Sequence, residues 1–183
     1  MTPIKRRPPR EEFFEQAFQR AAQLLAADAT QLEILACLVA GAEMAAGGGA
    51  VASILVMDED GLLRNGASPN LPSDYLKAID RLKPDPRIGT CAAAAATGAS
   101  VVTPDFRADD KWGELRHLPL ALGFVGAWSE PILAPDGSVL GTFGTYFRER
   151  REPSSVEVSG VRRLAAIAAK ALMRSCAGLH RQN

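Results

Sequence analysis

The chain has 183 residues, of which 47% are hydrophobic and 23% are charged, a composition that predicts one globular domain with at most an additional terminal helix. The 21 Lys and Arg residues equal the 21 Asp and Glu residues in number, so the formal net charge is zero. This balance removes the electrostatic argument for nucleic acid or an anionic membrane surface as a partner.

The start of the chain and its cysteines predict a cytoplasmic protein. Residues 1–10 are basic and proline-rich, which predicts a disordered lead-in instead of the apolar segment of a signal peptide. No apolar run approaches the roughly 18 residues that a membrane span needs. The three cysteines, Cys37, Cys91 and Cys176, are odd in number and far apart, so no disulfide framework is expected, in agreement with a reducing compartment.

Two helices are expected near the start of the chain. The first, over residues 11–27, carries apolar residues at helical spacing: Phe14, Phe18, Ala21 and Leu25. Either Asp28 or Thr30 can cap the second helix, over residues 31–46, and Thr30 would form a capping box with Glu33. The second helix has few charged residues, so it is expected to be largely buried.

The rest of the chain alternates strands with short helices. In order, the sequence predicts strands over 50–57 and 62–67, helices over 73–82 and 90–97, a strand over 100–103, a helix over 111–122 that is interrupted or restarted at Pro119, paired strands over 124–133 and 138–147, and a last helix over 154–176. Strands that pair in hairpins, with blocks of helices between them, predict an α+β fold. Its central sheet is expected to be largely antiparallel, with five to six strands flanked by helices.

Several consecutive segments resemble the motifs of one family. They are residues 63–72, the Ile88-Gly89-Thr90-Cys91 segment before an alanine-rich helix, Val101-Val102 followed by Asp105 and Trp112, the Ala127-Trp128-Ser129-Glu130-Pro131-Ile132 segment, and residues 136–143. In these motifs and in the order of its elements, the chain from about Gln31 to Met173 resembles a GAF domain, the small-molecule sensor module of bacterial signalling proteins. The resemblance implies a ligand held between the sheet and the helices on one face, and dimers formed through the terminal helices.

The terminal helices also predict a homodimer on physical grounds. Residues 29–178 are expected to form the GAF domain with its C-terminal helix, and residues 11–28 a separate dimerisation helix. The first and last helices carry more apolar surface than one sheet can bury, and a second copy could cover it in a helix bundle. The residues expected in that interface are Phe14, Phe18, Leu164 and Ala168. Alternatively, the N-terminal helix folds back over its own C-terminal helix and covers this surface within one chain.

The segment that begins the 90–97 helix is a candidate ligand site. Backbone N–H groups at Thr90 and Cys91 could attract a small anion or polar ligand atoms, and the alanines that follow permit close approach. Packing of a small-residue helix on the sheet is the alternative. Cys91 could be a partly activated thiol at this position, or a small buried hydrophobic residue.

The aromatic residues of the second half suggest the walls of a pocket. We expect the pocket between the last hairpin, with Trp128 and Phe143, and the helix that opens at Thr90, above a floor of glycine and threonine residues. Phe143 and Tyr146 lie on opposite faces of their strand, so one of them is expected to reach it. Further candidates are Trp112, as a lid or a loop anchor, and Asp105, as a polar contact or a turn residue.

No cofactor or metal is expected. His117 could bind haem iron axially, but a lone histidine on a mixed helix face is more typical of an ordinary surface or core residue. Bilin attachment typically uses a cysteine followed by histidine, and Ala92 follows Cys91 here. No CxxC or HxxxH spacing predicts a zinc site.

Three functions are compatible with the sequence. The first is a sensor that binds a small molecule without catalysis and acts in trans on a signalling partner, such as a sensor kinase. The second is the GAF branch that reduces free methionine-R-sulfoxide, whose chemistry needs an attacking and a resolving thiol. It is disfavoured because residues 75–90 and 104–130 contain no cysteine and only Cys91 approximates a cysteine position of that branch. The third is a dimerisation module whose pocket has decayed.

Overall fold

The computed structural model describes residues 8–179 of the chain, and side chains through residue 174. A five-stranded sheet, with strand order β2-β1-β5-β4-β3 and antiparallel pairing throughout, forms the centre. The strands are β1 (Val51–Met57), β2 (Leu63–Ala67), β3 (Val101–Thr103), β4 (Gly126–Leu133) and β5 (Val139–Phe147). The helices are α1 (Arg10–Ala26), α2 (Gln31–Ala46), α3 (Ser73–Ala78), α4 (Cys91–Thr97), the 3-10 turn η1 (Asp110–Trp112), α5 (His117–Ala121) and α6 (Ser155–Leu179).

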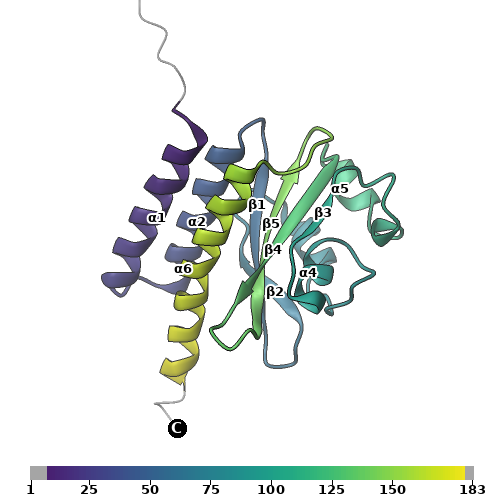
Figure 1. Ribbon diagram of the computed structural model, residues 1–183. Coiled ribbons are helices and arrows are strands. Elements are labelled where there is room, and N and C mark those ends of the chain that lie inside the picture. The colour runs from purple at the N-terminus through teal and green to yellow at the C-terminus, as the bar shows by residue number, and fades with distance from the viewer. Residues whose placement is uncertain (1–7, 180–183) are drawn as a thin grey trace, which may run out of the picture.

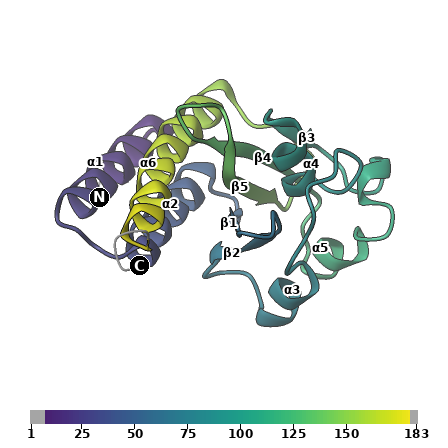
Figure 2. The ribbon, with the colours of Figure 1, turned by 90° about the horizontal axis from the view of Figure 1, so that it is seen from below.

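The helices form two groups on opposite faces of the sheet. The long helices α1, α2 and α6 lie together on one face, whereas α3, α4 and α5 lie on the other (Figures 1 and 2). Each face has its own hydrophobic core, one built from the long helices and one beneath the short helices and loops. The α+β fold with an antiparallel sheet of five strands is therefore confirmed.

The two central strands are buried on both faces. Every residue of β4 from Gly126 to Ile132 and of β5 from Gly141 to Phe147 is buried. Because side chains alternate along a strand, Phe143 and Phe147 face the long helices, whereas Tyr146 faces the short ones. The alternation decides which residues can share a site.

Both predicted helices at the start of the chain are confirmed, the second with its expected boundaries. Thr30 caps α2, and Glu33 completes the capping box by accepting a hydrogen bond from the Thr30 backbone N–H at 2.8 Å. Asp28 is not the cap, since it lies in the left-handed region with a φ of 53° in the turn between α1 and α2. The choice that the sequence left open is therefore decided in favour of Thr30.

Two predicted helices are shorter than expected. The 73–82 helix ends at Ala78, and Arg81 takes a φ of 60°, which a right-handed helix cannot contain. The 111–122 helix is broken into η1 and α5, with the break at residues 113–116 and not at Pro119. Pro119 is the third residue of α5, where a backbone N–H has no partner within the helix and proline is therefore tolerated.

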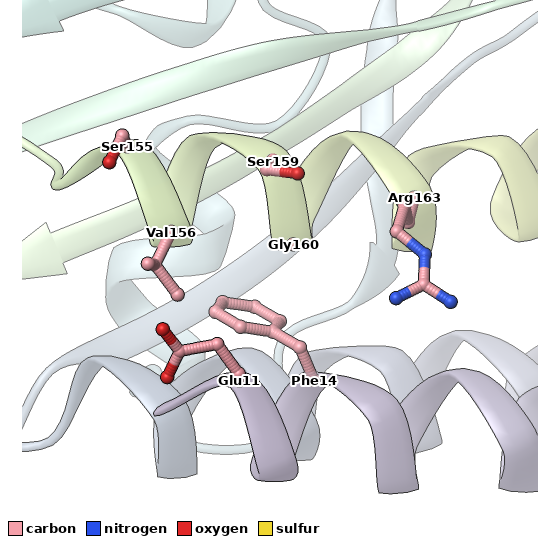
Figure 3. Close-up of a pocket in the computed structure, with 7 residues that line it drawn as sticks. All are labelled: Glu11, Phe14, Ser155, Val156, Ser159, Gly160 and Arg163. Atoms are coloured by element: carbon pink, nitrogen blue, oxygen red, sulfur yellow. The ribbon is translucent and has the colours of Figure 1, made fainter. Parts of the chain in front are cut away.

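Helix α1 packs closely against α2 and α6 of its own chain. A Cβ atom on Gly160 of α6 would collide with the ring of Phe14, and one on Gly41 of α2 would collide with the Cβ of Ala17. Figure 3 shows the Phe14 ring directed from α1 toward Gly160. The absence of side chains at these two glycines is what lets α1 approach both neighbours.

This packing buries surface that a second copy was expected to cover. Phe14, Leu164 and Ala168 are 4%, 0% and 0% exposed within one chain. Phe18 is half-buried, and the guanidinium carbon of Arg163 lies 4.4 Å from its ring centroid. The fold-back of the N-terminal helix, the alternative in the sequence, is the arrangement found. The homodimer stays a prediction and would have to use other surface.

A buried carboxylate fastens the start of α6. Glu157 is 2% exposed and accepts hydrogen bonds from both terminal nitrogens of Arg151, at 2.9 and 2.7 Å, and from the Ser154 backbone N–H at 2.8 Å. Arg10, the first residue of α1, lies 3.4 Å from the same carboxylate. Arg151 also stacks on Phe147 of β5, 3.7 Å from its ring centroid. Glu157 thus joins α6 to α1 through Arg10, and to β5 through Arg151.

Some predictions concern residues beyond the described range. The disordered lead-in over residues 1–10 lies outside it except for Pro8, Pro9 and Arg10, and Arg10 already begins α1. The side chain of Cys176 is also outside it. In the described part of the chain, none of the helices combines the length and apolar character that a membrane crossing requires.

Replacing Gly160 by alanine tests the packing of α1. Alanine normally stabilises a helix interior by about 1 kcal/mol relative to glycine. Here we expect a loss of about 1–3 kcal/mol in the free energy of unfolding, because the new methyl group displaces the Phe14 ring. Urea denaturation of Gly160→Ala and of the exposed neighbour Ser159→Ala measures the difference. In a Phe14→Ala background, Gly160→Ala is expected to become neutral or stabilising; stabilisation in the native background would contradict the packing.

The Glu157 carboxylate predicts a pH-dependent contribution to stability. Burial acts to raise its pKa, but hydrogen bonds from Arg151 and Ser154 outweigh burial, and the pKa lies below the ordinary value of 4.5. A lowered folded-state pKa gives stability that is present above pH 4.5 and lost as the pH falls through the folded-state pKa.

Glu157→Gln is therefore expected to lose about 2–3 kcal/mol of unfolding free energy at pH 7. The loss is expected to be smaller at pH 3, because the contribution of a carboxylate with a lowered pKa declines as the pH falls below 4.5. Chemical denaturation at both pH values measures this. The matched control is Glu149→Gln, because Glu149 pairs with the same Arg151 at 3.6 Å but is 74% exposed. An equal loss for Glu157→Gln at both pH values would show that the carboxylate charge does not contribute.

Candidate functional site

A small enclosed cavity lies between the sheet and the short helices. Four of the residues predicted for the site line it: Thr90, Cys91, Trp112 and Tyr146. The other lining residues are Leu55, Tyr75, Ile79, Leu82, Gly89 and Leu115. The space open to the centre of a water molecule measures about 20 Å³, enough for about one water. The cavity is therefore a mostly apolar, nearly filled space and not an open cleft.

Trp128 and Phe143 do not line this cavity. Trp128 pairs with Thr145 and Phe143 pairs with Glu130, and both aromatic side chains belong to the core beneath the long helices. Ala127 and Tyr146, which pair with each other, belong to the core on the opposite face. The expected position of the pocket, between Trp128, Phe143 and Thr90, is thus corrected, because the sheet itself separates the two aromatic residues from Thr90.

Helix α4 fills the space above the small residues of the sheet. A Cβ atom on Gly144 would lie 3.0 Å from the Cys91 sulfur, 3.3 Å from Ser53 Oγ and 3.4 Å from Ser129 Oγ. The Cys91 sulfur lies 3.0 Å from Ser129 Oγ, which donates a hydrogen bond to Thr90 Oγ1 at 3.1 Å. The small residues that were expected to leave room for a ligand instead admit the alanine-rich helix and its cysteine.

The Cys91 thiol is not activated. Burial raises its pKa, and the polar contact of the sulfur with Ser129 Oγ only partly opposes that rise. With 7% of the residue exposed, the thiol is protonated and shielded near neutral pH. The sequence allowed Cys91 to be either a partly activated thiol or a small buried residue, and the structure supports the buried residue.

Two tyrosines on different elements meet inside the cavity. The Tyr75 hydroxyl of α3 donates a hydrogen bond to the Tyr146 hydroxyl of β5 at 2.9 Å, and the rings meet edge to face at 5.9 Å. Burial raises the pKa of both hydroxyl groups, so both are neutral at physiological pH. Tyr75 was not among the residues predicted for the site. The spacing of Tyr75 and Ile79, four residues apart on a short helix, was the available signal for an inward face.

Trp112 forms the wall opposite the sheet. Its ring packs on Phe106 with a centroid separation of 4.4 Å, and it is 5% exposed. A Cβ atom on Gly89 would lie 3.5 Å from the ring, so glycine, with a φ of 55°, brings the backbone against the indole. Among the described residues, the indole N–H finds no hydrogen-bond partner. The Trp112 ring is thus held in place as one wall of the cavity, and its indole N–H makes no hydrogen bond to the described residues.

Asp105 lies elsewhere. Its carboxylate accepts a hydrogen bond from the Arg107 backbone N–H at 2.9 Å, as in an aspartate-stabilised turn, and it lines a separate surface groove with Arg150. His117 is exposed, and its Nδ1 lies 2.8 Å from the Glu114 carbonyl oxygen. Within the described residues, no cluster of three or more His, Cys, Asp and Glu side chains could hold a metal ion.

A larger groove, of about 220 Å³, opens between the first turns of α1 and α6 (Figure 3). Glu11 and Phe14 of α1 face Val156 and Arg163 of α6 across it. Arg163 is already paired with Glu15 at 2.9 Å, so the groove offers an anion little uncompensated charge. The enclosed cavity, with its unused donor, is the better candidate for a ligand.

Comparison with known proteins agrees with this architecture. A family model described as GAF domain matches residues 26–173. The chain is 33% identical over 153 residues to a protein of Methanosarcina acetivorans named methyl sulfide methyltransferase-associated sensor. That match covers 84% of this chain but only 15% of the relative.

Solved structures share the fold. A GAF domain from a phosphoenolpyruvate-protein phosphotransferase of Coxiella burnetii has a TM-score of 0.73 at 18% identity, covering 92% of this chain and 98% of that one. The free methionine-R-sulfoxide reductase of Neisseria meningitidis, in complex with its substrate, has a TM-score of 0.69 at 17% identity, covering 93% and 95%. The family match over most of the chain, on a fold of this kind, shows that the chain belongs to the GAF domain family.

Proposed function

We propose that this GAF domain is a cytoplasmic sensor that binds a small molecule in the cavity between Tyr75, Tyr146 and Trp112, without catalysis. The observation that carries the proposal is the buried indole N–H of Trp112, a residue that lines the cavity. This donor has no acceptor among the described residues, and a buried donor without an acceptor is costly unless a ligand or water satisfies it. The sensor name of the Methanosarcina acetivorans relative supports the same role. The signal would act in trans on a signalling partner such as a sensor kinase.

The arrangement of the thiols disfavours a reductase. A thiol-dependent reductase needs two cysteines that can meet, one to attack and one to resolve. Cys91 is buried on the cavity side of the sheet, whereas Cys37 packs at the edge of the core beneath the long helices. Burial also raises the pKa of Cys37. The similarity to the Neisseria meningitidis reductase is a similarity of fold and does not extend to a pair of adjacent thiols among the described side chains.

A dimerisation module is the second candidate, favoured by the small size of the cavity. A space of about 20 Å³ must enlarge before it admits more than a water molecule. In a module of this kind the cavity would hold water alone, and the long helices would carry the function. The two candidates therefore differ in whether a small molecule occupies the cavity.

Native mass spectrometry of the freshly purified full chain separates these candidates. We expect a bound small molecule in the native protein and in Leu133→Trp, since Leu133 is exposed on the last hairpin. Leu115→Trp is expected to lose it, because the larger ring fills the cavity. The same spectra give the oligomeric state, and circular dichroism checks that both variants fold.

Three results would count against the sensor. A ligand-free chain in every preparation, with no thermal shift from small-molecule extracts, favours the dimerisation module. A ligand retained equally by Leu115→Trp places the site elsewhere. Thiol-dependent turnover of free methionine-R-sulfoxide by the purified protein would favour the reductase.

A further inference from the structure

The residues that line the cavity offer no charge to a ligand. The ten of them include no Asp, Glu, Lys, Arg or His, as far as the described chain shows. The neighbouring cations are engaged elsewhere: Lys111 pairs with Asp109 at 2.8 Å, and Arg116 donates to the Arg107 carbonyl oxygen at 3.0 Å. An anion or zwitterion placed in the cavity would therefore be buried without a counter-charge, which is strongly unfavourable.

The residues that line the cavity include hydrogen-bond donors. An indole N–H is only a donor, and that of Trp112 is unpaired in the described structure at 5% exposure. One hydrogen bond joins the Tyr75 and Tyr146 hydroxyls, so one of their two hydrogens is left to seek another acceptor. Trp112 and both tyrosines line the same cavity. A molecule that presents an acceptor oxygen between them would satisfy groups that are otherwise costly to bury.

The remaining walls are aliphatic. Leu55 of β1, Ile79 and Leu82 after α3, and Leu115 after η1 surround the donors. Aliphatic walls favour carbon atoms around the acceptor oxygen of a ligand, and they offer no hydrogen-bond partner to a second polar group of that ligand. The cavity has room for about one water as it stands, so even a carbon frame of a few atoms requires these walls to move apart, and a larger frame is disfavoured.

We propose that the cavity selects a small uncharged molecule, with one acceptor oxygen and a short apolar frame, and rejects an anion of the same shape. The inference rests on the proposed ligand-binding function and adds the chemical class of the ligand. It replaces the small anion that the sequence allowed, because the lining supplies donors without positive charge. In the empty state one water molecule would take the place of the acceptor oxygen.

Acetone, acetate and nitrate test this selection, since all three are planar with four non-hydrogen atoms but only acetone is neutral. The chain has two tryptophans, so nitrogen-15 labelling gives two indole signals, and Trp112→Phe assigns them. We expect acetone to shift the Trp112 signal saturably, with a dissociation constant on the order of millimolar. Acetate and nitrate are expected to bind at least tenfold more weakly. Trp128 lies across the sheet, so its signal should not move.

Two substitutions complete the test. Trp112→Phe keeps a ring but removes the donor, and acetone affinity, followed by the tyrosine ring signals, should fall about tenfold. Trp128→Phe is the matched control and should keep the affinity. Equal or tighter binding of acetate or nitrate would overturn the selection while leaving the cavity a ligand site. If no probe shifts Trp112 in the native protein or in the enlarged variant Leu115→Ala, both the selection and the proposed function are wrong.

Discussion

The rest of the structure depends on strand β5 being covered on both faces. Its neighbours β1 and β4 satisfy its backbone, and seven successive residues, from Gly141 to Phe147, are buried. A strand in this position sends alternate side chains into two different cores, so one strand helps to build the long-helix layer through Phe143 and the cavity through Tyr146. A register slip of one residue would exchange these two sets and disrupt both cores.

The cavity and the terminal helices are joined at the end of that strand. Tyr146 lines the cavity, and the next residue, Phe147, lies on the opposite face beneath the guanidinium group of Arg151. Arg151 in turn holds Glu157 in the first turn of α6. The buried carboxylate needs these hydrogen bonds to stay charged, so the geometry at the start of α6 is tied to the end of β5. The proposed ligand site and the layer of long helices are therefore both in contact with the same end of β5.

Much of the fold could be predicted because local signals were strong. The Thr30 and Glu33 pair fixes the start of α2, and Gly98, with a φ of 63°, ends α4 as a left-handed C-cap. The candidate site was predicted less completely. Thr90, Cys91, Trp112 and Tyr146 meet at one cavity, but Trp128 and Phe143 lie across the sheet from it. Neighbouring motifs along a chain do not indicate which face of a sheet a side chain takes.

By itself, the sequence determined the order of the elements, the antiparallel α+β class and the family resemblance, because periodicity, caps and turn residues act over a few residues. Tertiary structure alone decided what covers each surface. Gly160 shows no sequence signal for contact with Phe14, nearly 150 positions away, yet that contact sets the place of α1. Gly144 suggested open space above the sheet, but the Cys91 side chain packs there. Tyr75 joins the site through the hydrogen bond between its hydroxyl group and that of Tyr146. These contacts join residues far apart in the chain, so only the packed structure brings them together.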